Sequence, residues 1–469
     1  MSGGPTFGPR YAWYVVLLLT ATQLVSYLDR FLPSLLLKSI KADLNATDFE
    51  IGLLMGPAFG LFYVLVAVPL GWLADRGSRR LILAAGIALW CTMTVGGAFV
   101  LAFVPLFMLR LGVGLGEAAV APCAVSLISD YFPRETRARA MSVFMAGTFL
   151  GAGTAFLAGG PLVAWIGGLP PFELPGVGAL RPWQMAFLIV GLPGFALAAL
   201  MFTVREPPRT ERVQGALRTD AGGNASLSAA FGYIRARWRA FGALMLGSSS
   251  MVVMGSLTFW NVALFERTWG WGVRDVGIGT GLMLLAGGTL GTLLGIRLSQ
   301  HWIAQGRKDA TFRSLWVGLA IAAPGFAISP LMPTPQLALG ALLFAFMGQA
   351  VVTPAGPASL SLIAPGQIRS QSTAIYFLVV GACGQIIGPT PVGLMTDLFG
   401  DPAKLRYAMA IQAAVVGVLA LGIVALGMGA YRRSVEELER LLAAGAGADA
   451  GGGSVAGVVA ATATPGVSR

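Results

Sequence analysis

Residues 71–80 read Gly-Trp-Leu-Ala-Asp-Arg-Gly-Ser-Arg-Arg and lie between two long apolar segments. Residues 51–70 before this stretch and residues 81–101 after it carry no charged side chain. An apolar helix of about 20 residues is long enough to cross the hydrocarbon core of a bilayer, which is about 30 Å thick. The stretch is therefore predicted to be a short charged turn that joins two membrane-spanning helices.

The composition of the whole chain extends this interpretation. Of its 469 residues, 56% are hydrophobic and 11% are charged, and the mean hydropathy is +0.74. Soluble globular proteins carry about 25% charged residues, and disordered chains are far less hydrophobic than this one. The composition excludes both classes and predicts an all-α polytopic protein of the cell inner (plasma) membrane.

Long segments that are poor in charge predict twelve transmembrane helices. The first is interpreted as a retained helix rather than a signal peptide, because Asp29 and Arg30, instead of a small-residue cleavage site, end its apolar run. The predicted spans are 11–36, 51–73, 81–101, 104–129, 140–166, 183–204, 241–265, 276–298, 314–332, 336–363, 370–396 and 407–431.

The basic residues indicate how these helices are oriented. With this assignment, 23 of the 32 Lys and Arg residues fall at the two termini and in the even-numbered loops. Cytoplasmic loops carry an excess of Lys and Arg, so both termini are predicted to be cytoplasmic. The net charge of +11 therefore reflects membrane topology, and we expect no nucleic-acid partner.

A long basic loop divides the chain into two halves. We predict an N-terminal six-helix bundle over residues 1–204, a cytoplasmic loop over 205–240 and a C-terminal six-helix bundle over 241–431. Residues 432–469 are predicted to form a short cytoplasmic helix at 434–442 and a disordered Gly/Ala-rich tail. The outer loop 167–182 contains Pro170, Pro171 and Pro175 and is expected to be irregular.

The two halves show weak internal similarity, which is typical of a duplicated transporter fold. Corresponding residues occur in the same order and at the same helix positions in the two halves. The matched positions are Asp48 and Asp275, Arg80 and Arg307, Pro122 and Pro357, Ser126 and Ser361, and Arg137 and Arg369.

The turn at residues 71–80 resembles the signature loop of the major facilitator superfamily, Gly-x-x-x-Asp-Arg-x-Gly-Arg-Arg, with Ser78 where the pattern has glycine. Residues 26–30, Ser-Tyr-Leu-Asp-Arg, and residues 110–118, Arg-Leu-Gly-Val-Gly-Leu-Gly-Glu-Ala, are similar to the Spinster-like branch of that superfamily. Members of this branch are proposed proton-linked carriers of lysolipids and sphingoid phosphates. The resemblance covers residues 10–205 well and the second half in architecture, and the four lysines against 28 arginines indicate a bacterial source.

Four ionisable residues, Asp29, Arg30, Arg110 and Glu117, lie well inside predicted helices. Each charge near a helix centre costs about 2.5–3.5 kcal/mol on insertion scales, so these side chains must face one another or an aqueous cavity. Arg110 and Glu117 share a helix face at an axial separation of about 10.5 Å, which is too far for a direct bond. Asp29 and Arg30 are expected at the depth of Arg110, and Glu117 nearer the membrane midplane.

These four residues are predicted to couple transport to protons. Asp29, beside guanidinium groups, is expected to stay ionised, whereas Glu117, among small apolar residues, is predicted to carry the proton. Arg110 or Arg30 would exchange between the two carboxylates and bias the halves between inward-open and outward-open states. The competing hypothesis is a static ion-pair cluster that only fixes helix packing.

The turn at 71–80 is predicted to form a cytoplasmic gate. The resemblance implies that Asp75 meets the positive N-terminal end of the eleventh helix and latches the gate. Alternatively, the charged turn is only a solvated loop that sets topology. The residues assigned to the gate are Gly71, Asp75, Arg76, Arg79, Arg80 and Arg137.

The resemblance also implies which helices line a substrate cavity. Their amphipathic side chains predict an aromatic, weakly polar cavity with positive charge on one side, which suits an amphipathic organic anion. Ordinary helix packing is the competing explanation for each residue. The candidates are Tyr27, Phe59, Tyr63, Thr148, Trp260, Asn261, Gln349, Tyr376 and Gln385.

Other functional classes find little support in the sequence. One histidine and three cysteines in apolar segments supply no evident metal or nucleophile site for a membrane enzyme, and no phosphate-binding loop indicates an ATP-driven pump. We therefore predict a monomeric secondary active transporter without a cofactor, powered by a proton gradient, for a lipid-like substrate. The alternatives are a proton symporter for small organic anions, a multidrug efflux carrier and a non-transporting lipid sensor.

Overall fold

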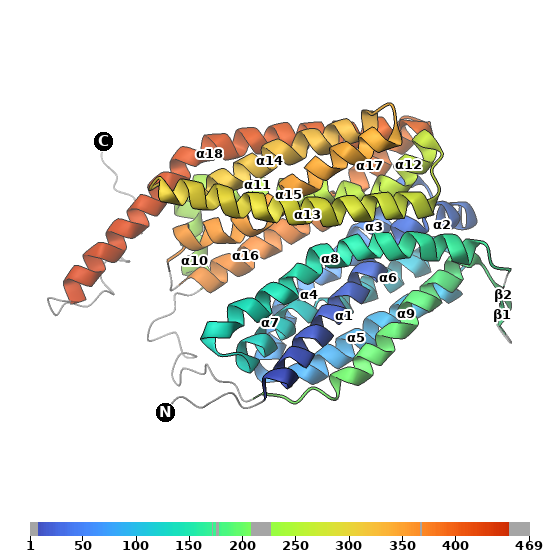
Figure 1. Cartoon of the computed structure of the whole chain (residues 1–469), viewed down its shortest axis with the longest axis horizontal. Helices are drawn as coiled ribbons and strands as arrows, with labels where there is room; N and C mark the ends of the chain where they lie inside the picture. The colour runs from blue at the N-terminus through green and yellow to red at the C-terminus, as the bar shows by residue number, and fades with distance from the viewer. Residues whose placement is uncertain (1–7, 171, 175–177, 208–226, 366–367, 450–469) are drawn as a thin grey trace.

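The computed structural model describes residues 8–170, 172–174, 178–207, 227–365 and 368–449. Within them, twelve helical segments are long and apolar enough to cross a membrane, which confirms the predicted number. The segments form two bundles, and the described chain begins and ends on the left in Figure 1. We call this side the termini end, and the opposite side, which carries a β-hairpin, the hairpin end.

In the first bundle, the second and the fourth spans are each interrupted by a break in the helix. The second span breaks at Gly56, which Pro57 follows as the first residue of the next helix, a position where proline is tolerated. The fourth span breaks at Ala118 and Ala119. The helices are α1 (Pro9–Leu35), α3 (Asp48–Met55) with α4 (Pro57–Arg76), α5 (Arg79–Gly96) with η1 (Gly97–Phe99), α6 (Phe103–Glu117) with α7 (Val120–Tyr131), α8 (Arg134–Gly167) and α9 (Pro182–Met201).

The second bundle has the same number of spans, and its seventh and eleventh spans are each built from three helical pieces. Its eleventh span contains a π-helical turn, η4 (Cys383–Ile387), before Pro389. The other elements are α11 (Trp238–Gly255), η2 (Ser256–Trp260), α12 (Asn261–Trp269), α13 (Val273–Ala304), α14 (Ala310–Ile328), η3 (Ser329–Leu331), α15 (Pro335–Ile363), α16 (Arg369–Ala382), α17 (Thr390–Leu398), η5 (Pro402–Lys404) and α18 (Leu405–Asp449). Two short helices, α2 (Leu37–Leu44) and α10 (Leu227–Ala236), complete the fold.

The structure differs from the sequence prediction in two connecting regions. The 167–182 loop contains an antiparallel hairpin of β1 (Phe172–Leu174) and β2 (Gly178–Leu180), so its prediction as irregular was wrong. Residues 434–442 are helical, but they continue α18 without a break, because Ser434 donates to the carbonyl of Ala430 instead of capping a new helix. The predicted disordered tail is helical as far as Asp449, and residues 450–469 lie outside the described part.

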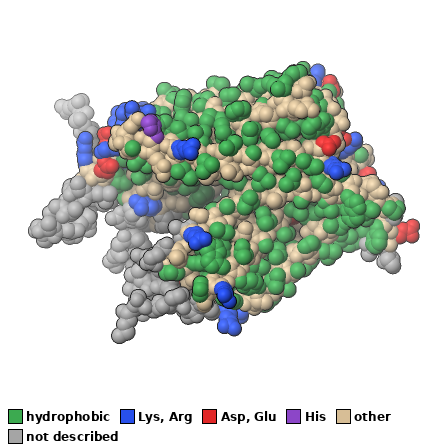
Figure 2. Space-filling view, viewed as in Figure 1, with side chains coloured by type: hydrophobic (Ala, Val, Ile, Leu, Met, Phe, Trp, Pro, Cys, Tyr) green, Lys and Arg blue, Asp and Glu red, His purple; other side chains and the backbone are tan. Residues whose placement is uncertain are grey.

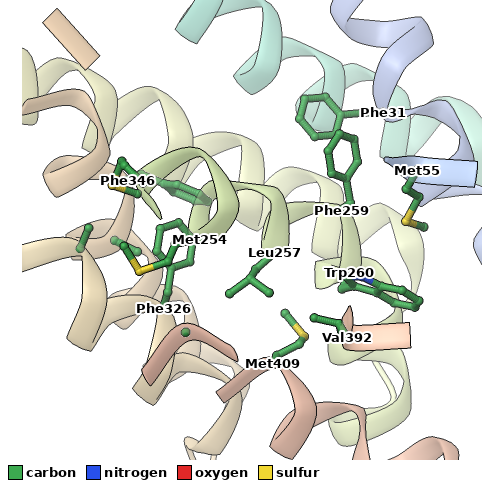
Figure 3. Close-up of a cluster of buried hydrophobic side chains, with 14 of the residues drawn as sticks. Phe31, Met55, Met254, Leu257, Phe259, Trp260, Phe326, Phe346, Val392 and Met409 are labelled. Carbon is green, nitrogen blue, oxygen red and sulfur yellow. The ribbon is translucent and has the colours of Figure 1, made fainter. Parts of the chain in front are cut away.

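The two bundles contact each other mainly toward the hairpin end, where α8 packs on α13 and α3 packs on α17. An apolar core is continuous across this junction. Figure 3 shows Phe31 of the first bundle beside Phe259 of the second, and their ring centres are 4.8 Å apart. Toward the termini end, Figure 2 shows a hollow between the two halves. The structure is therefore closed at the hairpin end and open at the termini end, which is an inward-open state under the predicted topology.

Glycines allow α8 and α13 to approach until their backbones touch. A Cβ atom on Gly277 would lie 2.6 Å from the Phe156 carbonyl oxygen and 2.7 Å from the Gly160 Cα atom. A Cβ atom on Gly281 would lie 2.7 Å from the Gly153 carbonyl oxygen. Small residues at such positions let membrane helices pack closely, so this glycine contact sets the distance between the bundles.

Gly277→Ala is expected to destabilise the protein, because its methyl group would overlap backbone atoms of α8. In a helix interior, alanine is normally more stable than glycine by about 1 kcal/mol. Overpacking, however, destabilises a protein by about 1–3 kcal/mol. Gly295→Ala on the same helix is the matched control, since its Cβ atom would lie 3.4 Å from the Val351 Cα atom. A thermal unfolding assay should show a lower Tm for Gly277→Ala only. Equal Tm values for the two variants would contradict the glycine contact.

Candidate functional site

The four ionisable residues predicted inside the helices form two separate ion pairs. One pair joins the Arg110 Nη1 atom to the Asp29 Oδ1 atom at 3.1 Å. The other pair joins the Arg30 Nη2 atom to the Glu117 Oε2 atom at 2.8 Å. Because Asp29 and Arg30 are neighbours on α1, their side chains diverge by about 100° around the helix and reach different partners on α6.

The Asp29 pair is buried and has hydrogen bonds on both carboxylate oxygens. Thr94 of α5 donates to the Asp29 Oδ2 atom at 2.9 Å, and Arg110 also donates to the Asp29 backbone carbonyl at 3.3 Å. Asp29 and Arg110 are each 2% exposed. This pair therefore connects α1, α5 and α6, and its geometry suits a fixed structural junction.

The Glu117 pair is less completely satisfied. Ser26 and Arg30 both donate to the Glu117 Oε2 atom, at 2.7 Å and 2.8 Å. The Glu117 Oε1 atom is buried and has no hydrogen-bond partner within the described residues. The Glu117 side chain is 1% exposed, whereas that of Arg30 is 14% exposed. One oxygen of this carboxylate is thus available to take a proton without displacing an existing bond.

Aromatic rings surround the guanidinium group of Arg30. Its Cζ atom lies 4.3 Å from the ring centre of Phe59, 5.0 Å from that of Tyr27 and 5.4 Å from that of Tyr63. Cations are attracted to aromatic faces at such distances. The structure therefore brings three predicted cavity residues together around one positive charge, and we call Arg30, Glu117 and these rings the Arg30 cluster.

Of the other predicted cavity residues, Thr148 lies beside the Arg30 cluster, where its side chain interacts with that of Tyr27, and the rest lie elsewhere in the fold. Thr148 accepts a hydrogen bond of 3.0 Å from Gln23, a residue of α1 that the sequence analysis missed. Gln385 packs against Gly60 of α4, at the contact between the bundles. Three further candidates pack within the second bundle, which agrees with ordinary helix packing. These are Trp260 and Tyr376, which are buried, and Gln349, which lies beside Gly255.

Asn261 is also buried, and its Nδ2 atom has no hydrogen-bond partner within the described residues. It begins α12, directly after Trp260, whose indole donates to the Pro389 carbonyl at 3.0 Å. Both residues therefore belong to the packed hairpin end rather than to the open side of the molecule.

The turn at residues 71–80 is anchored within the first bundle. Arg79 is 1% exposed and donates to Glu206 at 2.7 Å, to Ser126 at 2.8 Å and also to Asp130. Arg80 donates its backbone N–H to Glu206 at 3.2 Å. Burial acts to raise the pKa of Glu206, but the hydrogen bonds from Arg79 and Arg80 hold this pKa below its usual range. Glu206 was missed, because its sequence position identifies it only as part of a basic loop.

Of the remaining residues assigned to the gate, the structure describes the side chain of Arg137 but not those of Asp75 and Arg76. Gly71, Asp75 and Arg76 lie on α4, but the side chains of Asp75 and Arg76 are outside the described part of the structure, so the latch to the eleventh helix stays a prediction. Arg137 donates its Nε atom to the carbonyl of Phe132 at 3.4 Å. Arg369 makes the corresponding bond to Ala364 at 3.2 Å, which agrees with the proposed repeat of the two halves.

A charge network that the sequence analysis did not find closes the hairpin end. Asp48, at the start of α3, binds Lys41 at 2.6 Å and Arg267 of the second bundle at 2.8 Å. The Asp397 carboxylate of α17 accepts the backbone N–H groups of Asp48 and Phe49, at 3.1 Å and 2.7 Å. An acidic side chain at a helix N-terminus is stabilised by the helix dipole. Asp48, Arg267 and Asp397 therefore hold the two bundles together, and we call them the hairpin-end lock.

Comparison with known proteins identifies the family. The sequence pattern described as Major Facilitator Superfamily matches residues 19–344, well over half of the chain. The chain belongs to the Major Facilitator Superfamily. It is therefore a multi-pass membrane transporter of small molecules and not an enzyme.

Individual relatives refine this assignment to Spinster-like members of the superfamily. The chain is 28% identical to an "MFS-type efflux pump" of Mycolicibacterium smegmatis, over 92% of this chain and 96% of the relative. It is 26% identical to "Protein spinster homolog 1" of Xenopus tropicalis, over 88% of this chain and 80% of the relative. Similarity to bacterial proteins also agrees with the predicted inner-membrane location.

A solved structure gives the same fold. It is the crystal structure of a bacterial homologue of the human lysosomal transporter Spinster, in an inward-facing and unoccupied conformation. The two chains are 25% identical, the TM-score is 0.71, and the match covers 92% of this chain and 98% of the other. This agrees with the prediction of a Spinster-like transporter with twelve helices in two bundles.

Proposed function

We propose that this transporter is a proton-coupled carrier of an amphipathic organic anion of lysolipid or sphingoid type. The observation that carries the proposal is the buried Arg30–Glu117 pair, in which one carboxylate oxygen lacks a hydrogen-bond partner within the described residues. The proton gradient would supply the energy and no cofactor would be needed. A monomer is sufficient, because the cluster is built from one chain.

Protonation of Glu117 would remove the negative charge that Arg30 now faces at 2.8 Å. The guanidinium group would then be free to bind the anionic group of a substrate, since a buried charge without a partner is costly. The rings of Tyr27, Phe59 and Tyr63 would contact the apolar body of the same molecule. Proton and anion would therefore bind together, and their joint binding would bias the bundles between the two open states.

Similarity to the mycobacterial efflux pump favours a second candidate function, the export of amphipathic drugs. An aromatic surface would accept such molecules as well as lipids. The charge of the substrate separates the two functions, because Arg30 should prefer anions and disfavour cations. A carrier that moves mainly cationic compounds would support drug export and contradict the anion proposal.

The test uses the full chain reconstituted in liposomes. Lysolipids, sphingoid phosphates, small carboxylates and cationic dyes would first be compared for thermal stabilisation of the detergent-solubilised protein. Flux of each stabilising compound would then be measured without a pH gradient and with gradients of two sizes. We expect anionic amphiphiles to be stabilising and their flux to rise with the gradient. Flux that is independent of pH would refute proton coupling, and no flux of any stabilising compound would refute transport of these classes.

A further inference from the structure

The helix α10, between the two bundles in the sequence, and the start of α11 expose aromatic and arginine side chains. Phe231 and Trp238 are 62% and 64% exposed, and Arg235, one turn after Phe231 on α10, is also exposed. Arg239 follows on α11 with its guanidinium carbon 5.5 Å from the centre of the Trp238 ring. Two large aromatic rings and two arginines are thus exposed within residues 231–239, and we call these four side chains the exposed strip.

The opposite face of α10 is fixed to the second bundle. Ala230 is fully buried, and Tyr233 donates its hydroxyl to the Ile363 carbonyl at the end of α15, at 3.1 Å. Arg237 binds Glu437 of α18 at 2.6 Å and lies 3.9 Å from the Tyr233 ring centre. These contacts fix the orientation of α10 on the second bundle, so the exposed strip always faces away from that bundle.

The strip adjoins the start of a membrane-spanning segment. Trp238 is the first residue of the seventh transmembrane span, Trp238–Trp269. In Figure 1, α10 lies at the termini end near the start of α16, and it runs across the direction of the long helices. Tryptophan and other aromatic side chains are enriched at this level of a bilayer, and a helix in this position lies along the surface.

Among the described residues, no acidic side chain pairs with the arginines of the strip. Residues 227–241 contain three arginines and no acidic residue. Glu437 pairs with Arg237, and no ion pair is found for Arg235 or Arg239 within the described part of the chain. Anionic phospholipid headgroups at the bilayer surface are the partner that complements both the exposed arginines and the rings.

We propose that α10 and the start of α11 form a docking surface for anionic phospholipids of the leaflet at the termini end. Phe231 and Trp238 insert at the level of the headgroups, and Arg235 and Arg239 bind lipid phosphates. Through Tyr233 and Arg237 the bound surface is connected to α15 and α18, so anionic lipid stabilises the termini end of the second bundle. This role does not require the proposed proton coupling or substrate.

The test measures hydrogen exchange of backbone amides in residues 227–241 of the full chain. The protein would be placed in nanodiscs of phosphatidylcholine alone or with 30% phosphatidylglycerol, a composition chosen for the assay. Each arginine near an anionic surface contributes about fivefold to binding. We therefore expect exchange to be several-fold slower with phosphatidylglycerol, and expect this protection to fall at high salt because the charges are screened.

Two variants make the test specific. Arg235→Gln combined with Arg239→Gln should abolish the protection that phosphatidylglycerol provides. The matched control combines Arg307→Gln with Arg440→Gln, which removes two exposed arginines from the same half of the chain. It should retain the protection. Phe231→Ala with Trp238→Ala should speed exchange in both lipid compositions, because aromatic insertion does not depend on lipid charge.

Three results would overturn the proposal. The first is equal exchange of the wild-type segment in the two lipid compositions. The second is full protection in the Arg235→Gln, Arg239→Gln variant. The third is the same protection in phosphatidylcholine nanodiscs when glycerol phosphate is added to the solution, since that would indicate a site for a soluble anion. None of these readouts uses transport, so failure of this proposal is distinguishable from failure of the proposed function.

Discussion

Replacing Glu117 with glutamine is expected to abolish substrate accumulation driven by a pH gradient while preserving substrate exchange across the membrane. Glutamine has the shape of the protonated glutamate and cannot release a proton, so the coupling step is lost and the binding surface is kept. Ser26 and Arg30 could still donate to its amide oxygen, as they now donate to the Glu117 carboxylate. In liposomes, the accumulation ratio should fall to about one, the value expected when no energy is coupled.

Counterflow of labelled substrate without a pH gradient is the accompanying measurement, and it should stay within about threefold of the wild type. Glu173→Gln is the control, because Glu173 lies exposed on β1, away from the Arg30 cluster. Its accumulation ratio should be unchanged. Full accumulation by Glu117→Gln would refute the role of Glu117 as the proton carrier. Loss of both accumulation and counterflow would instead support a static ion pair that fixes helix packing.

Asp48→Asn is expected to shift the protein strongly toward the state that is open at the hairpin end. Asp48 is 1% exposed and has ion pairs with Lys41 and Arg267, and only the second of these connects the bundles. Removing one partner of a buried, hydrogen-bonded charge pair typically costs about 2–5 kcal/mol. A change of about 2–3 kcal/mol in the relative stability of the two states would alter their ratio about 30-fold to 150-fold.

Distances between two spin labels would measure this shift. Suitable labelling sites are Ala42 in the first bundle and Ala403 in the second, since both are exposed at the hairpin end. The three native cysteines would first be replaced. In the Asp48→Asn variant, the long-distance population should become dominant, and transport should slow because the state closed at the hairpin end is needed in each cycle.

Asp43→Asn is the matched control for the hairpin-end lock. Asp43 also lies at the hairpin end, but its partners Arg181 and Trp183 belong to the same bundle. Its loss should leave the distance distribution unchanged, although it removes the same type of charge. A similar shift in both variants would show that negative charge at this end, rather than the bond between the bundles, controls closure.

The sequence determined the features that depend on local composition and spacing. Twelve spans follow from apolar segment length, because each helix must satisfy its backbone in lipid on its own. The same reasoning identified Asp29, Arg30, Arg110 and Glu117 as a group, since charges inside spans must find partners. It also placed Asp29 and Arg30 at the depth of Arg110, because oppositely directed helices bring these positions together, but it did not decide that Asp29 is the one that pairs with Arg110.

Only the tertiary structure decided which partners meet over long sequence distances. Asp29 and Arg30 are adjacent, yet the helix directs them to different residues, and Glu117 keeps an oxygen without a hydrogen-bond partner within the described residues. The local sequence pattern does not show which partner each side chain reaches, because this depends on how the helices pack. The hairpin-end lock joins residues separated by more than 200 positions. A glycine allows the close approach at this contact, since a Cβ atom on Gly393 would lie 2.1 Å from the Asp48 carbonyl oxygen.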